Sequence, residues 1–438
     1  MKTPLIVCVI NALPIDSVDR QILPTSSLIN VHSIAKVQSL LNRLLSEGKE
    51  MFTNNFPKDS YRILSCDGGV IRGILTAALL EELEKQLRAK NPDRQLRDYF
   101  DIIAGTSTGS LLACGIANGI SAKEMKELYR YTGLQIFPPL KDTLRSLIWR
   151  LLNEEIDFSE FDTFNLLHRG KEDTKKFMSQ PVYDGEGLED VLKDIFGCQQ
   201  LGELPKLVIV PSYDVYNHDA VIFKNNAEEF KTMPVWEVCR ASCAAPVAFP
   251  AHVTQNEEFL KSLKEKAKKA GEEPNIKVPD DGIPLIDGGI VANNPVLCAI
   301  AECRTQFKTL PSVVASFGSG WTLNRITVRE AKGWGGFNWT SLLRNIPLMD
   351  VFSDGSTDAT DYIAKQLLKG ESEYFRFQPL LKENVSAFSA DPDNLDLLVE
   401  IAERFLETQE CKDDMTKLVE SLTSSDRSFL GSLVAASA

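Results

Sequence analysis

A serine with the surroundings of a nucleophile stands in the stretch Gly105-Thr106-Ser107-Thr108-Gly109. The apolar run at 99–104 predicts a strand before it, and the run at 110–117 predicts a buried helix after it. Glycines on both sides let the backbone turn sharply, which leaves the serine hydroxyl exposed between the two elements. The N-terminus of the helix also favours negative charge beside the serine. The pattern therefore predicts Ser107 as a nucleophile.

A serine nucleophile needs a base, and the usual base is histidine. The chain has four histidines, and none follows His252. The α/β-hydrolase order places the catalytic histidine last, near the end of the domain. His218 and His252 do not lie in a recognisable loop at the end of a strand. A histidine triad is therefore disfavoured.

An aspartate offers an alternative base in the stretch Asp287-Gly288-Gly289, which follows the apolar run at 283–286. The two glycines allow another loop to approach closely. An isolated aspartate has a pKa of about 3.9 and is a weak base at neutral pH, but burial beside a serine raises that pKa. The residues alone are equally compatible with a turn or capping role for Asp287.

A glycine-rich loop, Asp67-Gly68-Gly69-Val70-Ile71-Arg72-Gly73, joins a predicted strand at 61–66 to a predicted helix at 74–89. Backbone N–H groups at Gly68 and Gly69, with Arg72 close by, suit an oxyanion. Such a loop suits a phosphate equally well, because a nest of amides binds either anion. The P-loop pattern G-x-x-x-x-G-K-[ST] is absent, which makes a P-loop NTPase a poor fit.

The cysteines do not indicate a metal site. Cys239/Cys243 and Cys298/Cys303 lack zinc-site spacing, so we expect no metal and no cofactor. Nine scattered cysteines in 438 residues also do not resemble a disulfide framework, which favours a reducing compartment.

The composition limits the partners of the chain. A net charge of −13 makes it a poor candidate for nucleic-acid binding and argues against purely electrostatic attachment to anionic lipid. No apolar run reaches the roughly 18 to 20 residues of a membrane-spanning helix. The apolar run at 4–10 is predicted to be a strand rather than a signal peptide. We therefore expect a cytoplasmic protein.

Predicted strands and helices alternate from 61 to 132, which indicates an α/β fold with a parallel or mixed sheet. We divide the chain into an N-terminal extension with an amphipathic helix, a central domain, and C-terminal helices whose Ser-rich end after Leu422 frays. The central domain contains a cap region and a densely charged insertion, which we read as a surface element rather than a mobile lid. The boundaries are 1–58, 59–380 and 381–438, with the cap at about 133–185 and the insertion at about 255–280.

Two further stretches are compatible with contact with a membrane. A helix at 144–152 carries Trp149 and two arginines, although a cap helix packed on the core is the preferred interpretation. The glycine-rich aromatic stretch at 333–339 suits either an interfacial loop or a buried turn.

Three of these stretches together resemble the patatin-like phospholipase family: Asp67–Gly73, Gly105–Gly109 and Asp287–Gly289. Ala244-Ala245-Pro246 and Asn293-Asn294-Pro295 resemble its flanking motifs, and the resemblance spans about residues 60–380. It implies a three-layer α/β/α sandwich around a mainly parallel sheet, with helical additions at both ends. It also implies lipid acyl hydrolysis without a metal, by a dyad of Ser107 and Asp287 with an oxyanion hole at Gly68 and Gly69 and Arg72 in the family's basic position.

The chain departs from the family pattern at one position. The family's loop usually reads Asp-Gly-Gly-Gly-x-Arg/Lys-Gly, and here Val70 replaces the third glycine. If the turn requires a positive φ at this position, a β-branched residue is costly there.

The leading functional prediction is an acyl hydrolase of the phospholipase A or lysophospholipase type, which contacts membranes peripherally when active. Val70 motivates a second prediction, a binding or scaffold protein with weak or no catalysis. A third is an esterase for non-lipid esters. The sequence identifies no activator, and it leaves open whether the protein works in its own cell or is delivered to another.

Overall fold

The computed structural model describes residues 60–139, 181–269, 276–322, 325–339, 347–382 and 385–436, and for residues 337 and 425–436 it describes the backbone alone. The described residues belong to one compact unit, Ser60–Ala438. The N-terminal extension predicted at 1–58, the helix at 144–152 and most of the predicted cap region lie outside them. The domain boundaries at 59 and 380 stay predictions.

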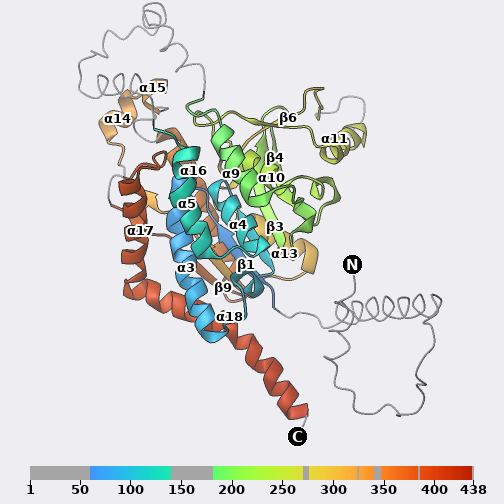
Figure 1. Ribbon diagram of the computed structural model, residues 1–438, viewed down its shortest axis with the longest axis vertical. Helices are drawn as coiled ribbons and strands as arrows, with labels where there is room; N and C mark the ends of the chain where they lie inside the picture. The colour runs from blue at the N-terminus through green and yellow to red at the C-terminus, as the bar shows by residue number, and fades with distance from the viewer. Residues whose placement is uncertain are drawn as a thin grey trace, which may run out of the picture. The chain divides into compact units, whose positions relative to one another are not determined.

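A mixed, mostly parallel sheet forms the middle of the unit (Figure 1). Its eight strands are β1 (Arg62–Cys66), β2 (Ile102–Gly105), β3 (Leu207–Asp214), β4 (Asp219–Lys224), β5 (His252–Thr254), β6 (Ile283–Asp287), β7 (Val313–Phe317) and β9 (Glu373–Phe377). They run in the order β5-β6-β3-β2-β1-β7-β9, and β4 also pairs with β3. The four pairs from β3 through β2, β1 and β7 to β9 are parallel, whereas β4, β5 and β6 join antiparallel.

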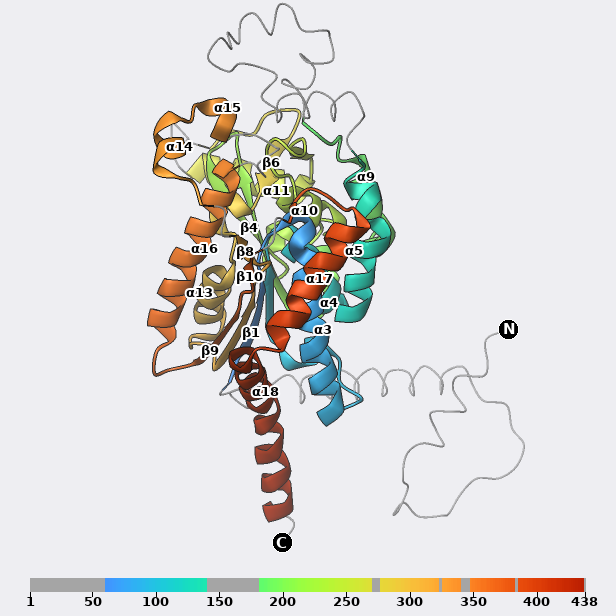
Figure 2. The same ribbon diagram turned by 90° about the vertical axis from the view of Figure 1, so that its left-hand side faces the viewer.

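Helices cover both faces of this sheet, which gives three layers (Figure 2). One face carries α3 (Gly73–Lys90), α4 (Thr108–Asn118), α5 (Ala122–Ile136), α9 (Glu186–Phe196), α10 (Val235–Ser242) and α17 (Pro392–Leu406). The other face carries α12 (Gly289–Ala292), α13 (Val296–Phe307) and α16 (Pro347–Leu368). The predicted three-layer α/β/α fold class is confirmed. None of the helices within the described ranges is both long and apolar enough to cross a membrane.

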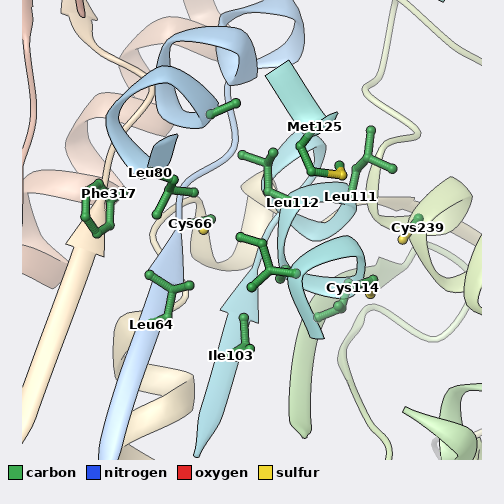
Figure 3. Packing of buried hydrophobic residues seen from close by; sticks show 14 of the residues in the cluster. Leu64, Cys66, Leu80, Ile103, Leu111, Leu112, Cys114, Met125, Cys239 and Phe317 are labelled. Carbon is green, nitrogen blue, oxygen red and sulfur yellow. The ribbon is translucent and has the colours of Figure 1, made fainter. Parts of the chain in front are cut away.

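Alternating side chains of the central strands supply both apolar layers, because successive residues of a strand point to opposite faces. Leu64 of β1 and Ile103 of β2 pack with Leu112 of α4 (Figure 3). Their neighbour Ile63 points the other way and packs in a second cluster with Val296 of α13. Strands buried on both faces explain the short, nearly continuous apolar runs in the sequence.

The C-terminal segment consists of two helices, α17 and α18 (Gln409–Ala436). α18 continues as a helix to Ala436 (Figures 1 and 2), and the fraying expected after Leu422 stays a prediction. The hydroxyls of Ser421 and Thr423 donate to carbonyls one turn earlier, at 2.9 and 2.7 Å. These two hydroxyls are therefore satisfied within the helix, and no proline interrupts the segment.

The charged insertion forms α11 (Glu257–Lys269) on the surface. Two apolar residues, Phe259 and Leu263, are buried. The Phe259 ring centroid lies 5.5 Å from that of Phe230 and 6.5 Å from that of Phe223. This aromatic anchor favours a fixed surface helix over a mobile lid.

The aromatic stretch at 333–339 spans the end of α14 (Val328–Gly333) and α15 (Gly336–Trp339). The rings of Trp334 and Trp339 pack edge to face with centroids 5.2 Å apart, and both side chains are half-buried.

The smaller elements are β8 (Trp321–Thr322) and β10 (Leu380–Leu381), which pair in parallel, and the 3-10 helices η1 (Val70–Arg72), η2 (Leu96–Tyr99), η4 (Leu201–Glu203) and η5 (Glu228–Phe230).

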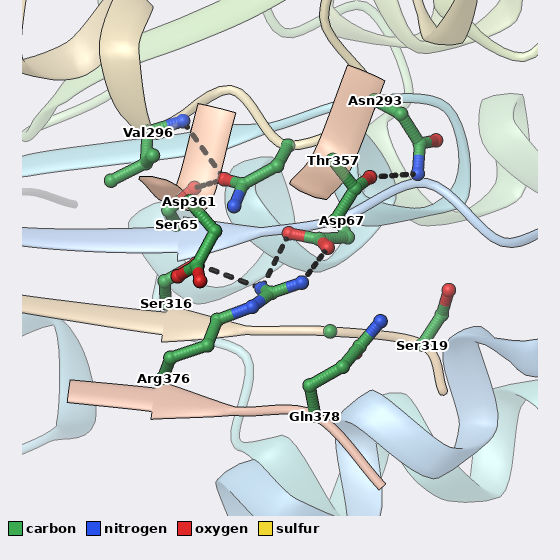
Figure 4. Close-up of polar contacts among 12 residues, drawn as sticks. Ser65, Asp67, Asn293, Val296, Ser316, Ser319, Thr357, Asp361, Arg376 and Gln378 are labelled. Carbon is green, nitrogen blue, oxygen red and sulfur yellow. Dashed lines mark hydrogen bonds and ion pairs between the residues drawn. The ribbon is translucent and has the colours of Figure 1, made fainter. Parts of the chain in front are cut away.

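A buried ion pair ties the end of β1 to β9 across the intervening β7 (Figure 4). Arg376 donates to both carboxylate oxygens of Asp67, at 3.0 and 2.5 Å, and to Ser316 Oγ at 2.9 Å. Burial raises the pKa of Asp67, and the Arg376 guanidinium opposes that rise. The pair fixes the first residue of the glycine-rich loop.

We expect Arg376→Gln to lower the free energy of unfolding by about 3–5 kcal/mol, because it leaves a buried carboxylate without its cation. Urea-induced unfolding measures this change. The matched control is Lys85→Gln, which breaks an exposed pair with Glu82 and should cost less than about 1 kcal/mol. Equal costs for the two variants would contradict a buried anchor at Asp67.

Candidate active site

Ser107 lies in a sharp turn between β2 and α4. Its backbone φ is +52°, a conformation that L side chains rarely adopt. The turn is tight, since a Cβ added to Gly105 would lie 2.0 Å from the Gly109 carbonyl oxygen. The Ser110 hydroxyl donates to the Ser107 carbonyl oxygen at 2.6 Å and holds the turn. The structure therefore shows the strand–turn–helix arrangement that the sequence predicts.

The Ser107 hydroxyl donates a hydrogen bond to Asp287 Oδ2 at 2.7 Å. The two side chains come from positions 180 residues apart and are both buried. Asp287 ends β6, which runs antiparallel to β3 and pairs Asp287 with Ser212. β3 continues past the level at which β2 ends, and β6 pairs with this extension while running back toward β2, so its last residue lies beside the turn that follows β2. The structure thus brings together the two residues predicted as nucleophile and base.

The environment of Asp287 suits a proton acceptor. Burial raises its pKa to about 6, and hydrogen bonds from Ser107 and from the Gly289 N–H limit that rise. The Gly289 amide donates to Oδ1 at 2.7 Å, so each carboxylate oxygen has one donor. Gly288 is required for packing, because a Cβ there would lie 2.1 Å from the Pro211 carbonyl oxygen.

Ser242, the last residue of α10, supports the serine turn and was not singled out by the sequence analysis. Its hydroxyl accepts the Ser107 N–H at 2.9 Å and donates to the Pro211 carbonyl at 2.7 Å. The backbone after it also holds β6, since the Asp287 N–H donates to the Ala244 carbonyl at 3.0 Å. Its position directly before Cys243-Ala244-Ala245-Pro246 is the one signal in the sequence that points to it.

The glycine-rich loop lies against Ser107, but it does not offer all the donors expected of it. The Gly68 N–H donates to the Asn293 carbonyl oxygen at 3.0 Å, so this amide is occupied in the structure. Within the described part of the chain, the amides of Gly69 and Val70 have no hydrogen-bond partner, and both residues line the pocket. The prediction of Gly68 as an oxyanion donor therefore does not fit this arrangement. Gly68 instead allows close packing, since a Cβ there would lie 3.2 Å from the Ser107 Cβ.

Val70 adopts a φ of +56°, in the left-handed region that favours glycine. The loop therefore does require a positive φ at the position where the family pattern has its third glycine. Valine keeps this conformation at a local cost of about 1–2 kcal/mol. The loop thus keeps its backbone conformation with valine in place of glycine, and the strained residue lines the same pocket as Ser107.

Arg72 lies in the pocket wall rather than against the serine. Its Nε donates to the Gly69 carbonyl at 3.4 Å, and its Nη2 lies 4.0 Å from Asp350 Oδ1 of α16. Burial raises the pKa of Asp350 to about 6, while Arg72 opposes the rise. Asp354, one turn later, also has a raised pKa because it is partly buried.

A pocket of about 510 Å³, which includes open space at its mouth, leads to Ser107 and Asp287. Its wall combines the glycine-rich loop, Pro246, the start of α16 and Phe388. Among the residues that the structure describes, no histidine lines it: His252 lies on β5 and contacts Glu237 at 3.2 Å, and His218 lies in the turn between β3 and β4. In the part of the chain that is described, no cluster of His, Cys, Asp or Glu is suited to hold a metal ion.

Comparison with known proteins identifies the family. The patatin-like phospholipase family model matches residues 64–300. Patatin-like protein 2 of Oryza sativa subsp. indica is 27% identical over 386 residues, which cover 81% of this chain and 85% of that protein. Patatin-17 of Solanum cardiophyllum is 27% identical over 383 residues, which cover 82% and 87%. Among solved structures, VipD from Legionella pneumophila is 15% identical, with a TM-score of 0.32 and coverage of 83% of this chain and 67% of that one. A match over more than half of its length, on the segment that carries the serine turn and the aspartate, shows that this chain belongs to the patatin-like phospholipase family.

Proposed function

We propose that the chain is a serine acyl hydrolase of the phospholipase A or lysophospholipase type. The observation that carries the proposal is the hydrogen bond of 2.7 Å from Ser107 Oγ to a buried carboxylate at the end of a pocket. Family membership supports a lipid acyl ester as the substrate.

In the proposed reaction, Asp287 Oδ2 takes the proton of Ser107 Oγ as the oxygen attacks the ester carbonyl carbon. The carbonyl oxygen becomes an oxyanion beside the amides of Gly69 and Val70. Collapse of the tetrahedral intermediate breaks the ester bond, and the departing alcohol takes the proton from Asp287. Water then attacks the carbonyl carbon of the acyl-serine while Asp287 accepts one of its protons. The bond between that carbon and Ser107 Oγ breaks, Oγ takes the proton back from Asp287, and the fatty acid leaves.

The position of Asp287 explains how a carboxylate can do the work of a histidine. A pKa of about 6 leaves it largely ionised at neutral pH and still a stronger base than an exposed aspartate. A catalytic histidine usually needs a third residue that orients its imidazole ring. Asp287 is oriented instead by the Gly289 N–H, which donates to the second oxygen of its carboxylate.

Val70 supports the alternative of a catalytically weak binding protein, since a strained residue stands where the oxyanion is expected. The conformation of the loop argues against it, because Val70 already has the positive φ of the glycine it replaces.

The first prediction concerns the dyad. We expect Ser107→Ala to reduce hydrolysis of a phospholipid to background, and Asp287→Asn to reduce kcat by about 10²–10⁴-fold, the usual contribution of a positioned base. Quantifying the released fatty acid measures both. Asp281→Asn, at an exposed aspartate ahead of the same strand, is the control and should retain full activity. Wild-type turnover in either dyad variant would exclude this mechanism.

The second prediction concerns pH. Since Asp287 acts as a base only when ionised, kcat/KM should rise about tenfold per pH unit below a pH of about 6 and level off above it. A rate profile from about pH 4.5 to about pH 8 on an uncharged ester measures this.

Three variants test whether this rise in rate below pH 6 belongs to Asp287, because burial raises the pKa of the pocket residue Asp350 to about 6 as well. The rise should persist in Asp350→Asn, His218→Asn and His252→Gln. Its disappearance in any one of them, with activity retained, would assign the rise to that residue instead of Asp287.

The third prediction concerns Val70. We expect Val70→Gly to change kcat by less than about threefold, because the backbone already has the conformation that glycine prefers. Val70→Ala is the control that keeps a Cβ at the positive φ. A rise in kcat of more than about tenfold in Val70→Gly alone would show that valine holds the wild-type protein in a weakly active state.

A further inference from the structure

Exposed apolar side chains lie next to residues that line the active-site pocket. Each is the immediate sequence neighbour, before or after, of a residue that lines the pocket. We call this set the mouth patch, and its members with their exposed fractions are Val247 (42%), Ile290 (38%), Leu348 (36%), Val351 (48%) and Phe352 (59%).

Helix α16 extends the mouth patch along its outer side. The face turned to the sheet buries Thr357, Ala364 and Leu368. At 100° per residue, the opposite face carries Leu348 and Phe352, then Ala359 and the exposed side chains of Tyr362 and Ile363. The outer face of a surface helix is normally polar, so this face has the composition of a contact surface.

The mouth patch itself carries no charge. The two aspartates nearest to it on the described part of α16, Asp350 and Asp354, lie close to Arg72 of the pocket wall. The patch offers no lysine or arginine, and the chain as a whole has a net charge of −13. An anionic surface is therefore a poor match, and an uncharged or zwitterionic surface is a good one.

We propose that the mouth patch docks on a zwitterionic lipid surface and holds the pocket mouth against it. The proposal rests on the proposed function, because it assigns the lipid surface to the same side as the ester-cleaving site. A protein bound over the patch would close the pocket, whereas a lipid surface delivers acyl esters directly into it. Phe352 and Val351, the most exposed members, lie on α16 directly beside the lining residues Asp350 and Ser353.

The test compares two double variants that each add two negative charges to an exposed helix surface. Val351→Asp/Phe352→Asp changes the mouth patch, and Tyr131→Asp/Leu134→Asp changes two exposed residues of α5 outside it. Both are made in a Ser107→Ala background, so that binding to phosphatidylcholine vesicles is measured by co-sedimentation without turnover. We expect the patch variant to lose at least about tenfold in vesicle binding, the amount expected when even one apolar side chain no longer enters lipid. The α5 variant should bind as Ser107→Ala does.

Parallel measurements keep the two proposals separate. With Ser107 intact, the patch variant should hydrolyse a monomeric short-chain ester at about the wild-type rate. Unchanged vesicle binding of the patch variant, or an equal loss in the α5 variant, would overturn the docking proposal even if the ester is cleaved. Loss of vesicle binding confined to the patch variant supports docking even if no phospholipid is cleaved, in which case the proposed function fails alone.

The molar mass in solution tests a different occupant. If the Ser107→Ala protein is a dimer without vesicles and the patch variant is a monomer, the mouth patch is covered by a second copy and the lipid proposal is wrong. A monomer in both cases agrees with a lipid surface as the occupant.

Discussion

The hydrogen bond between Ser107 Oγ and Asp287 Oδ2 is the interaction on which the rest of the site depends. It joins residues from two distant parts of the chain in a place that solvent barely reaches. A buried carboxylate is costly unless donors satisfy it, and Asp287 has one donor for each oxygen. The same burial raises its pKa to about 6. Burial therefore lowers the stability of the charged carboxylate and also makes that carboxylate a stronger base.

The sheet is arranged around this contact. β1 and β2 are parallel and end in register at Cys66 and Gly105, which places the glycine-rich loop and the serine turn at one edge. β6 runs antiparallel to β3, and its last residue, Asp287, lies at that edge. Strain collects there, in the positive φ angles of Ser107 and Val70, and it persists because the surroundings are fixed. The Asp67–Arg376 pair and Ser242 are two of these fixed supports, one on each side of the serine.

The sequence was sufficient for the parts of the site that follow local rules. A serine flanked by glycines between a strand and a helix, and an aspartate at the end of a strand, are recognisable because each depends on its neighbours in the chain. Ser242 and the engagement of the Gly68 amide by Asn293 depend on strand register and could not be predicted in that way. β9 was missed for a related reason, because its Arg376 resembles a surface residue until Asp67, 309 positions earlier, is placed beside it.

The central claim is that Ser107 is a nucleophile activated by a carboxylate without a histidine. The most direct measurement is reaction of the wild-type protein with a fluorophosphonate probe, followed by mass spectrometry of its peptides. The account predicts one adduct, on Ser107, because that hydroxyl alone combines the strained turn with a buried base in the described pocket. An unmodified protein, or an adduct on a different serine, would contradict it.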